Sequence, residues 1–421
     1  MPFSNLGFSP TVLPALQRAL LGEGFKTPTP IQVQAIPAIL QGRDVLASAQ
    51  TGSGKTAAFS LPMLQHICDS APTAPRRTHS LIVVPTRELA VQVGLAINSF
   101  AKFLPQRVKV AVVFGGVSIN PQMLHLRGGA DIVVATPGRL LDLIDSNAVS
   151  IGQVSTLVLD EADRLLDLGF GDELGRIMVL LPRQRQNLFF SATFPPAAQA
   201  LASSMLHNPQ RIEVLPELEE AVDIVQRAIE VDAPRRTQLL RHLIETQKYS
   251  RALVFAATKH ATEIIAVKLR TAGISAEPFH GELSQGKRTQ VLLDFKLRRL
   301  EVMVATDVAA RGIDITKLPV VINYDLPRSA VDYTHRIGRT GRAGESGLAL
   351  SFVSAQTAAH WRLIQKRHSL DIALEHVAGF EPTELAPEAS HDPAAPSNGG
   401  IKGKRPSKKD KLRAAADQKL N

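Results

Sequence analysis

Short runs of apolar and β-branched residues recur along the chain, and longer segments of helical character separate them. Because nearly every position within a run is apolar, both faces of each strand are expected to be buried, as in a parallel sheet covered by helices. The pattern predicts two α/β units. The runs occupy residues 44–47, 81–84, 108–114, 132–135, 156–159, 188–191 and 211–215, and then 252–256, 276–279, 301–305, 320–324 and 348–353.

Two changes in composition divide the chain. Residues 215–220 read Leu-Pro-Glu-Leu-Glu-Glu, a polar stretch with a proline that favours a linker. Beyond about residue 380 the chain is rich in Pro, Glu, Ala and Ser and then in Lys and Arg, so it can bury too little apolar surface to become ordered. We expect an N-terminal domain at 1–214, a linker at 215–222, a C-terminal domain at 223–380 and a flexible basic tail at 381–421.

Composition narrows the class of protein. With 421 residues, 44% of them hydrophobic and 21% charged, the chain has the make-up of a soluble protein with more than one domain. Its single cysteine, Cys68, excludes an intrachain disulfide and a multi-cysteine zinc site. No apolar run approaches the roughly 20 residues of a membrane helix, and the first residues do not resemble a signal peptide. We expect a cytoplasmic protein.

The charge balance favours a polyanionic partner. The chain carries 48 Lys and Arg against 39 Asp and Glu, a net charge of +9. Clustered basic side chains release counterions from phosphates, which favours binding of nucleic acid. Residues 401–421 hold eight basic residues and two aspartates, so six of the nine net charges lie there. This segment is either a solvated solubility tail or an arm that attracts phosphates; it lacks the aromatic residues needed for base stacking.

A glycine-rich segment links the first apolar run to a helix-like stretch. Residues 49–56 read Ala-Gln-Thr-Gly-Ser-Gly-Lys-Thr, a phosphate-binding loop with alanine in place of its first glycine. Its glycines let backbone N–H groups surround phosphates at a helix N-terminus, whereas a simple Gly/Ser turn is the alternative. Lys55 is expected to reach the β- and γ-phosphates, and the Thr56 hydroxyl to bind Mg²⁺. The nucleotide contacts are then Ala49, Gln50, Thr51, Gly52, Ser53, Gly54, Lys55 and Thr56.

An acidic motif follows the run at 156–159. Residues 160–163 read Asp-Glu-Ala-Asp, and a carboxylate at the C-terminal end of a strand is where a metal ligand belongs. We interpret Asp160 as the Mg²⁺ ligand and Glu161 as the general base for the attacking water. The alternative is an acidic helix N-terminus that offsets the helix dipole, but the phosphate loop upstream favours the nucleotide site.

Together these motifs resemble the DEAD-box family of RNA helicases, its general bacterial members in particular, and the resemblance runs from residue 3 to residue 342. It implies an α/β fold of two tandem recombinase-like (P-loop) parallel-sheet domains, joined by a short linker and followed here by a disordered basic tail. It also implies an ATP-dependent RNA helicase that hydrolyses ATP on RNA binding and locally unwinds or remodels RNA duplexes or RNA–protein complexes. The implied cofactors are ATP and Mg²⁺. The implied partners are single-stranded and duplex RNA, bound largely without sequence preference by a monomer, with ribosome assembly and RNA decay both open.

Residues 24–32 resemble the family's adenine-reading motif, in which a glutamine amide pairs with both edges of adenine. The resemblance implies base contacts from Phe25, Thr27 and Gln32 and stacking by an upstream aromatic residue, for which Phe3 is the candidate. The spacing from Phe3 exceeds the family's usual spacing by about four residues, roughly one helical turn, so Phe8 competes for this role.

Further motifs carry the resemblance into RNA binding and coupling. Small residues, hydroxyls and arginines after strands can meet the sugar–phosphate backbone without reading bases. The implied RNA contacts are Pro85, Thr86, Arg87, Gly116, Thr136, Pro137, Gly138, Arg139, Gln285, Arg288 and Thr306. The implied coupling residues are Asp163, Ser191, Thr193, His335 and Arg336, with the two hydroxyls bonded to Asp163 and with His335 and Arg336 tied to the same motif.

Arginines of the second domain complete the implied site. Arg339 and Arg342 resemble the arginine fingers that stabilise charge on the γ-phosphate, and Asp314 is implied to lie near the ribose. Two rival functions remain. A processive DNA helicase or translocase shares the phosphate loop and arginines, although Asp-Glu-Ala-Asp with the glutamine motif points to RNA. An RNA clamp would use ATP only to lock its grip, although Glu161 and both arginines favour turnover.

Overall fold

The computed structural model describes residues 2–49, 52–70, 74–214, 224–310, 313, 315, 318–341 and 346–384. Met1 to Thr383 form one compact unit. The expected linker and almost all of the expected tail lie outside the described residues. None of the helices in the described part of the chain combines the length and apolar character that a membrane span requires.

The first sheet has seven strands, all paired in parallel, in the order β3-β4-β2-β5-β6-β1-β7. Every one of these strands overlaps a predicted run. The order places the ends of β5, β6 and β1 side by side, so the segments that follow these strands meet at one edge of the sheet. The strands are β1 (Val45–Ser48), β2 (Ser80–Val83), β3 (Val110–Val113), β4 (Ile132–Ala135), β5 (Thr156–Leu159), β6 (Gln186–Ser191) and β7 (Gln210–Glu213).

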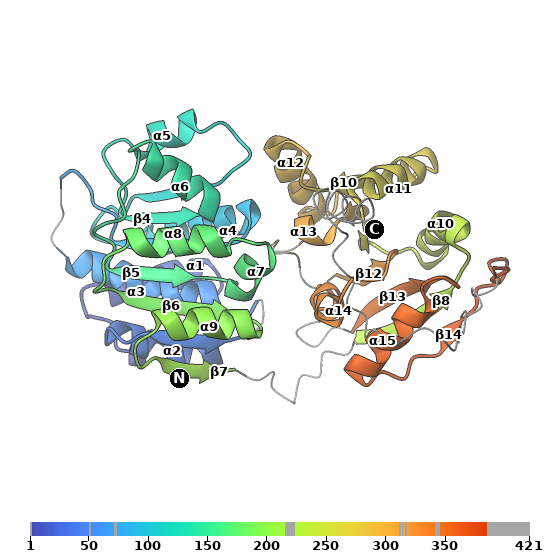
Figure 1. The fold of residues 1–421 in the computed structure, drawn as a ribbon, viewed down its shortest axis with the longest axis horizontal. Helices are drawn as coiled ribbons and strands as arrows, with labels where there is room; N and C mark the ends of the chain where they lie inside the picture. Colours follow the sequence, from blue (N-terminus) through green and yellow to red (C-terminus); the bar gives the residue numbers. More distant parts are fainter. Residues whose placement is uncertain are drawn as a thin grey trace, which may run out of the picture. The chain divides into compact units, whose positions relative to one another are not determined.

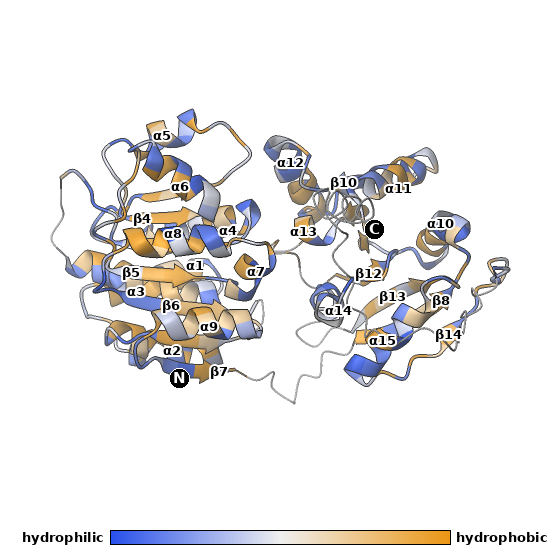
Figure 2. Cartoon of the chain, viewed as in Figure 1, coloured by the Kyte–Doolittle hydropathy of each residue, from blue (hydrophilic) through white to orange (hydrophobic). Residues whose placement is uncertain are grey.

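Helices cover both faces of this sheet, as the apolar strands required (Figure 1). Phe189 and Phe190 are adjacent in β6 and fully buried, yet they belong to two different hydrophobic clusters, one on each face. Figure 2 shows how apolar and polar residues are distributed: the strands are apolar and the outer faces of the helices are polar. The helices are η1 (Phe3–Asn5), α1 (Leu13–Gly22), α2 (Pro30–Leu40), α3 (Lys55–Asp69), α4 (Arg87–Ala101), α5 (Asn120–Leu126), α6 (Pro137–Asp145), α7 (Ala162–Asp167), α8 (Gly171–Leu180) and α9 (Pro196–Met205).

The second sheet is also parallel, in the order β10-β11-β9-β12-β13-β8-β14. Two of its strands, β8 and β14, were absent from the predicted runs. The strands are β8 (Ile224–Glu230), β9 (Ala252–Phe255), β10 (Ala276–Phe279), β11 (Val302–Ala305), β12 (Val320–Asn323), β13 (Gly347–Val353) and β14 (Leu374–Glu375). The helices are η3 (Ala233–Arg235), α10 (Arg236–Gln247), α11 (Lys259–Thr271), α12 (Gln285–Lys296), α13 (Asp307–Ala310), α14 (Ala330–Ile337) and α15 (Ala358–His368).

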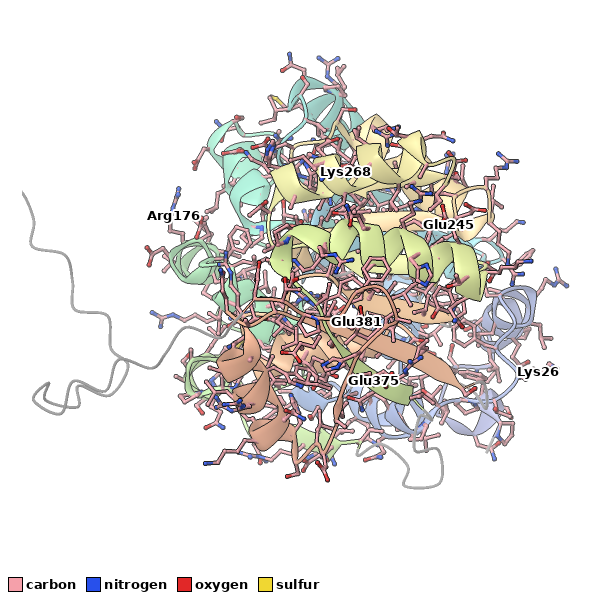
Figure 3. All side chains as sticks on the ribbon, turned by 90° about the vertical axis from the view of Figure 1, so that its right-hand side faces the viewer. Lys26, Arg176, Glu245, Lys268, Glu375 and Glu381 are labelled. Atoms are coloured by element: carbon pink, nitrogen blue, oxygen red, sulfur yellow. The ribbon has the colours of Figure 1, made fainter. Side chains whose placement is uncertain are left out.

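The segment after α15 packs along the edge of the second sheet. Glu375 in β14, labelled in Figure 3, forms an ion pair with Arg227 of β8, with 2.5 Å between Oε2 and Nη2. Further on, the Asp232 carboxylate accepts hydrogen bonds from the N–H and the hydroxyl of Thr383. Phe380 packs against the hydrophobic cluster beneath. The compact unit therefore continues to Thr383, past the boundary expected at residue 380.

Candidate nucleotide and RNA site

The phosphate loop turns from β1 into α3 and leaves its N–H groups at a helix N-terminus. Gly54 caps α3 in a left-handed conformation with φ of 93°, which costs a glycine nothing. Lys55 is the first residue of α3, is only 7% exposed, and donates a hydrogen bond from Nζ to the carbonyl of Ala49 at 2.9 Å. The ammonium thus lies inside the loop, where phosphates bind. Gln50 and Thr51, which the sequence assigned to the nucleotide, lie outside the described residues.

The start of α2 holds the loop from behind. Thr29 donates from Oγ1 to the carbonyl of Ser53 at 2.7 Å. Gln32 is fully buried, donates from Nε2 to the carbonyl of Gly54 at 3.1 Å, and accepts the Thr29 N–H at 3.0 Å. Gln32, expected to read adenine, therefore also supports the phosphate loop. Thr29 was missed by the sequence reasoning, although Thr-x-x-Gln is a capping-box pattern that signals a helix start.

A cavity of about 730 Å³ adjoins the loop and is lined by Phe25, Thr29 and Lys55. Phe25 also contacts Phe100 edge-on, with 5.8 Å between ring centroids. Phe3 and Phe8 are both buried in the hydrophobic core, 6% and 7% exposed, and neither is among the described residues that line the cavity. Adenine stacking by Phe3 stays a prediction. Thr27 is exposed and is not among the described residues that line the cavity.

The acidic motif reaches the same cavity from the end of β5. Asp160, Glu161 and Thr56 line it together. Asp160 is 3% exposed, and burial raises the pKa of its carboxyl to about 6, against the opposing effect of the Lys55 charge. Asp160 Oδ1 accepts the N–H of Glu161 at 3.0 Å. Burial has therefore left a carboxylate whose charge is not fully compensated.

These residues fit Mg²⁺. A buried carboxylate oxygen and a threonine hydroxyl are hard oxygen ligands of the kind Mg²⁺ prefers. The cation would also balance the negative charge of the buried Asp160 carboxylate. Among the described residues no group of three or more His, Cys, Asp or Glu forms a metal cage. The remaining ligands would be nucleotide phosphates and water, which is the usual arrangement for Mg²⁺ at phosphate loops.

The segment after β6 binds the last residue of the acidic motif. Thr193 donates to Asp163 Oδ2 from Oγ1 at 2.6 Å and from its backbone N–H at 2.9 Å. Ser191 Oγ accepts the Asp163 N–H at 3.3 Å and donates to the carbonyl of Thr193 at 2.6 Å. The expected contacts of both hydroxyls with Asp163 are confirmed, the serine through the backbone rather than the carboxylate. Their coupling role stays a prediction.

The Asp163–Thr193 contact gives a first test. Replacing Thr193 with valine keeps the side-chain shape but removes a hydrogen bond to a carboxylate, worth about 1.5–3 kcal/mol. We expect Thr193→Val to lower the number of RNA duplexes separated per ATP hydrolysed by about tenfold, with smaller loss of ATPase rate. Thr271→Val is the matched control because, within the described part of the chain, that hydroxyl bonds to the carbonyl of Val267 in its own helix. An unchanged ratio in Thr193→Val would remove Thr193 from the coupling.

Two arginines of the second domain, Arg336 and Arg339, have different surroundings. Arg336, expected to tie the site to Asp163, instead binds Asp307 with Nε and Nη2 at 2.6 and 2.7 Å. Its Nη1 donates to Asn323 and to the carbonyl of Asp325. These four hydrogen bonds lie within the second domain; the coupling role of Arg336 stays a prediction. His335 does line a cavity of about 390 Å³ together with Asp163 and Thr193.

Arg339 reaches the cavity beside the phosphate loop, and its role as an arginine finger stays a prediction. It lines the nucleotide cavity, is 6% exposed, and donates from Nη1 to the carbonyl of Ile313 at 2.8 Å. Asp314 and Arg342, expected at the ribose and the γ-phosphate, lie outside the described residues.

The loops assigned to RNA in the first domain support one another. Thr86 and Thr136 cap α4 and α6, and Thr136 Oγ1 accepts the N–H of Gly115 at 3.3 Å. Gly116 has φ of 74°, and a Cβ there would lie 1.8 Å from Nη2 of Arg87. The Arg87 guanidinium therefore packs directly on the backbone of Gly116, where any side chain would collide with it. Nearby, Pro85 precedes α4, and Pro137 and Gly138 form the first turn of α6.

Two arginines assigned to RNA are engaged inside the protein. Arg139 is 8% exposed and donates from Nη2 to the carbonyl of Val117 at 2.8 Å. Arg288 is 4% exposed, pairs with Glu88 Oε2 at 2.8 Å, and lies over the Phe279 ring. Arg139 thus holds the segment that contains Val117, and Arg288 is paired with α4; direct contact of either arginine with RNA stays a prediction. The other two expected contacts are Gln285, which begins α12, and Thr306, which follows β11.

Comparison with known proteins identifies the family. Residues 29–201 match the DEAD/DEAH box helicase family, and residues 235–344 match the helicase conserved C-terminal domain. The chain belongs to the DEAD-box RNA helicases. It is accordingly an ATP-dependent RNA helicase that hydrolyses ATP and unwinds or remodels RNA.

Several DEAD-box relatives cover most of the chain. The ATP-dependent rRNA helicase rrp3 of Sclerotinia sclerotiorum is 40% identical over 90% of this chain and 78% of its own length. CshA of Bacillus cereus, a DEAD-box ATP-dependent RNA helicase, is 39% identical over 86% of this chain and 67% of its own length. Yeast Dbp5 bound to RNA and ADP BeF3 superposes with a TM-score of 0.76 at 31% identity, over 89% of this chain and 95% of that one. The tandem-domain fold is confirmed.

Proposed function

We propose that this DEAD-box helicase uses Mg²⁺ with ATP. We also propose that it binds the sugar–phosphate backbone of RNA and does not read the base sequence. The observation that carries the proposal is the convergence of three strand ends: the phosphate loop after β1, Asp160 and Glu161 after β5, and Thr193 after β6. The residues proposed to bind phosphate, to take a proton from water and to contact Asp163 therefore lie at one edge of one sheet.

The chain's own residues divide the work of hydrolysis. Lys55 and the N-terminus of α3 hold the phosphates, and bound Mg²⁺ would supply positive charge between the Thr56 hydroxyl and Asp160. Glu161 orients the attacking water and takes its proton. Arg339 adds positive charge on the phosphate from the second domain. The contact between Asp163 and Thr193 then couples hydrolysis of the γ-phosphate to the loops that bind RNA.

We further propose structured RNA, such as ribosomal RNA, as the substrate class. A relative that covers most of the chain is named an rRNA helicase, and the net charge of +9 suits an extended polyanion. The residues assigned to RNA follow strands and present hydroxyls and backbone, which suits recognition of sugar and phosphate. We propose that the protein works as a monomer in the cytoplasm.

The test is steady-state ATP hydrolysis with no nucleic acid, with single-stranded RNA and with DNA of the same sequence. We expect strong stimulation by RNA alone, and its loss in Lys55→Ala, because that variant lacks the buried ammonium of the loop. Equal stimulation by DNA would indicate a general nucleic-acid motor. Tight RNA binding without turnover would indicate a clamp that ATP merely locks.

A further inference from the structure

Arg164 directly follows the acidic motif, and its side chain folds back onto it. Its guanidinium Nη1 donates a hydrogen bond to Oε2 of Glu161, and each of the two side chains is only 7% exposed. Such a pair is costly to bury but costlier to break, because removal of one partner leaves an uncompensated buried charge. Arg164 Nε is buried and has no hydrogen-bond partner among the described residues. The guanidinium is thus held by Glu161.

The local charge requires this arginine. Asp160, Glu161 and Asp163 place three carboxyl groups within four residues. Lys55 lines the same cavity as Asp160, and Arg164 forms an ion pair with Glu161. Removing Arg164 would leave Glu161 buried beside two other acidic groups, with its negative charge unpaired.

The backbone of Glu161 also needs a restraint. Its φ of 51° and ψ of 50° lie in the left-handed region, which residues other than glycine adopt at an energetic cost. Arg164 returns to Glu161 twice, through the guanidinium and through its backbone N–H, which donates to the Glu161 carbonyl at 2.9 Å. The guanidinium contact holds the carboxylate, and the backbone contact closes the turn that carries it.

Arg164 also joins the base to the coupling contact. Its backbone N–H lies 3.0 Å from Oδ1 of Asp163, while Oδ2 of the same carboxylate is held by Thr193. Its side chain lines the cavity shared with Thr193 and His335. A continuous set of contacts therefore runs from Thr193 through Asp163 and Arg164 to Glu161.

We propose that Arg164 is the positioning residue of the general base, which it ties to the Asp163–Thr193 contact. By holding Oε2 it leaves Oε1 of Glu161 for the attacking water. The water oxygen bonds to the γ-phosphorus as the bond to the bridging oxygen of ADP breaks, and the water proton passes to Glu161. This inference rests on the proposed role of Glu161 in ATP hydrolysis.

The first experiment compares Arg164→Gln and Arg164→Lys in RNA-stimulated ATP hydrolysis by the full chain. We expect Gln to lower kcat about 100-fold, the scale of loss when a reacting group is misplaced, while the KM for ATP is unchanged. Lysine keeps a cation within reach of Oε2 and is expected to recover most of the rate. Arg176→Gln is the matched control, because Arg176 forms an exposed ion pair with Asp145 and projects from the surface in Figure 3.

A double-mutant cycle separates positioning from folding. In single-turnover phosphate release, Glu161→Gln/Arg164→Gln should be no slower than Glu161→Gln alone, because Arg164 acts only through Glu161. The double variant carries neither charge of the Glu161–Arg164 pair, so we expect it to fold even if Arg164→Gln is destabilised. A double variant slower by the full Arg164→Gln factor, or wild-type kcat in Arg164→Gln, would overturn the positioning role. A wild-type chain without RNA-stimulated hydrolysis would overturn the proposed function instead.

Discussion

Replacing Glu161 with glutamine is expected to stop ATP turnover while the protein still binds ATP and RNA. Glutamine has the shape of glutamate, and its carbonyl oxygen can accept the hydrogen bond from Arg164. It cannot take a proton from water, and loss of a general base costs about 100-fold to 10,000-fold in rate. The measurement is phosphate release in a single turnover with saturating RNA, beside equilibrium binding of a fluorescent ATP analogue and of RNA.

The control for this variant is Glu245→Gln on α10. Glu245 forms an exposed i,i+4 ion pair with Arg241, so its replacement removes the same charge from the surface. It should leave phosphate release unchanged. Phosphate release at the wild-type rate in Glu161→Gln would remove Glu161 from the base role. Loss of nucleotide binding would show that the carboxylate serves the ground state rather than the reaction.

Replacing Gly54 with alanine is expected to weaken nucleotide binding at least roughly tenfold. A Cβ at this position would lie 2.4 Å from Nε2 of Gln32 and 2.9 Å from Oγ1 of Thr29, in a backbone with φ of 93°. The left-handed conformation costs alanine about 1–2 kcal/mol. Displacing Gln32 also removes its hydrogen bond to the Gly54 carbonyl, worth about 1 kcal/mol. Titration with the fluorescent ATP analogue measures the change.

Gly42→Ala separates backbone strain from the steric clash. Gly42 also has a left-handed backbone, with φ of 75°, but an added Cβ there meets nothing within 4 Å in the described part of the chain. We expect this variant to lower the melting temperature without changing nucleotide affinity. Equal affinities for the two alanine variants would mean that contact between Gln32 and the loop does not shape the nucleotide site.

The strands were predictable where both faces are buried. Runs such as Leu157–Val158 in β5 are apolar at consecutive positions, which is unmistakable in a sequence. β8 was missed because its outer half is only partly covered and reads as a mixed segment, with Arg227 in the middle. β14 is two residues long and pairs with β8 at the sheet edge, where Glu375 also meets Arg227. Neither strand has a local pattern that identifies it.

The sequence by itself determined the chemistry of the site. Lys55, Asp160 and Glu161 lie in short segments whose residue types and spacing predict a phosphate contact, a metal ligand and a general base, because each motif forms locally at the end of one strand. The tertiary structure alone decided which polar groups meet across those segments. Gln32 holds the loop, and Arg336 turns to Asp307 rather than Asp163. These partners depend on strand order and burial, and neither is visible in the spacing of residues along a chain.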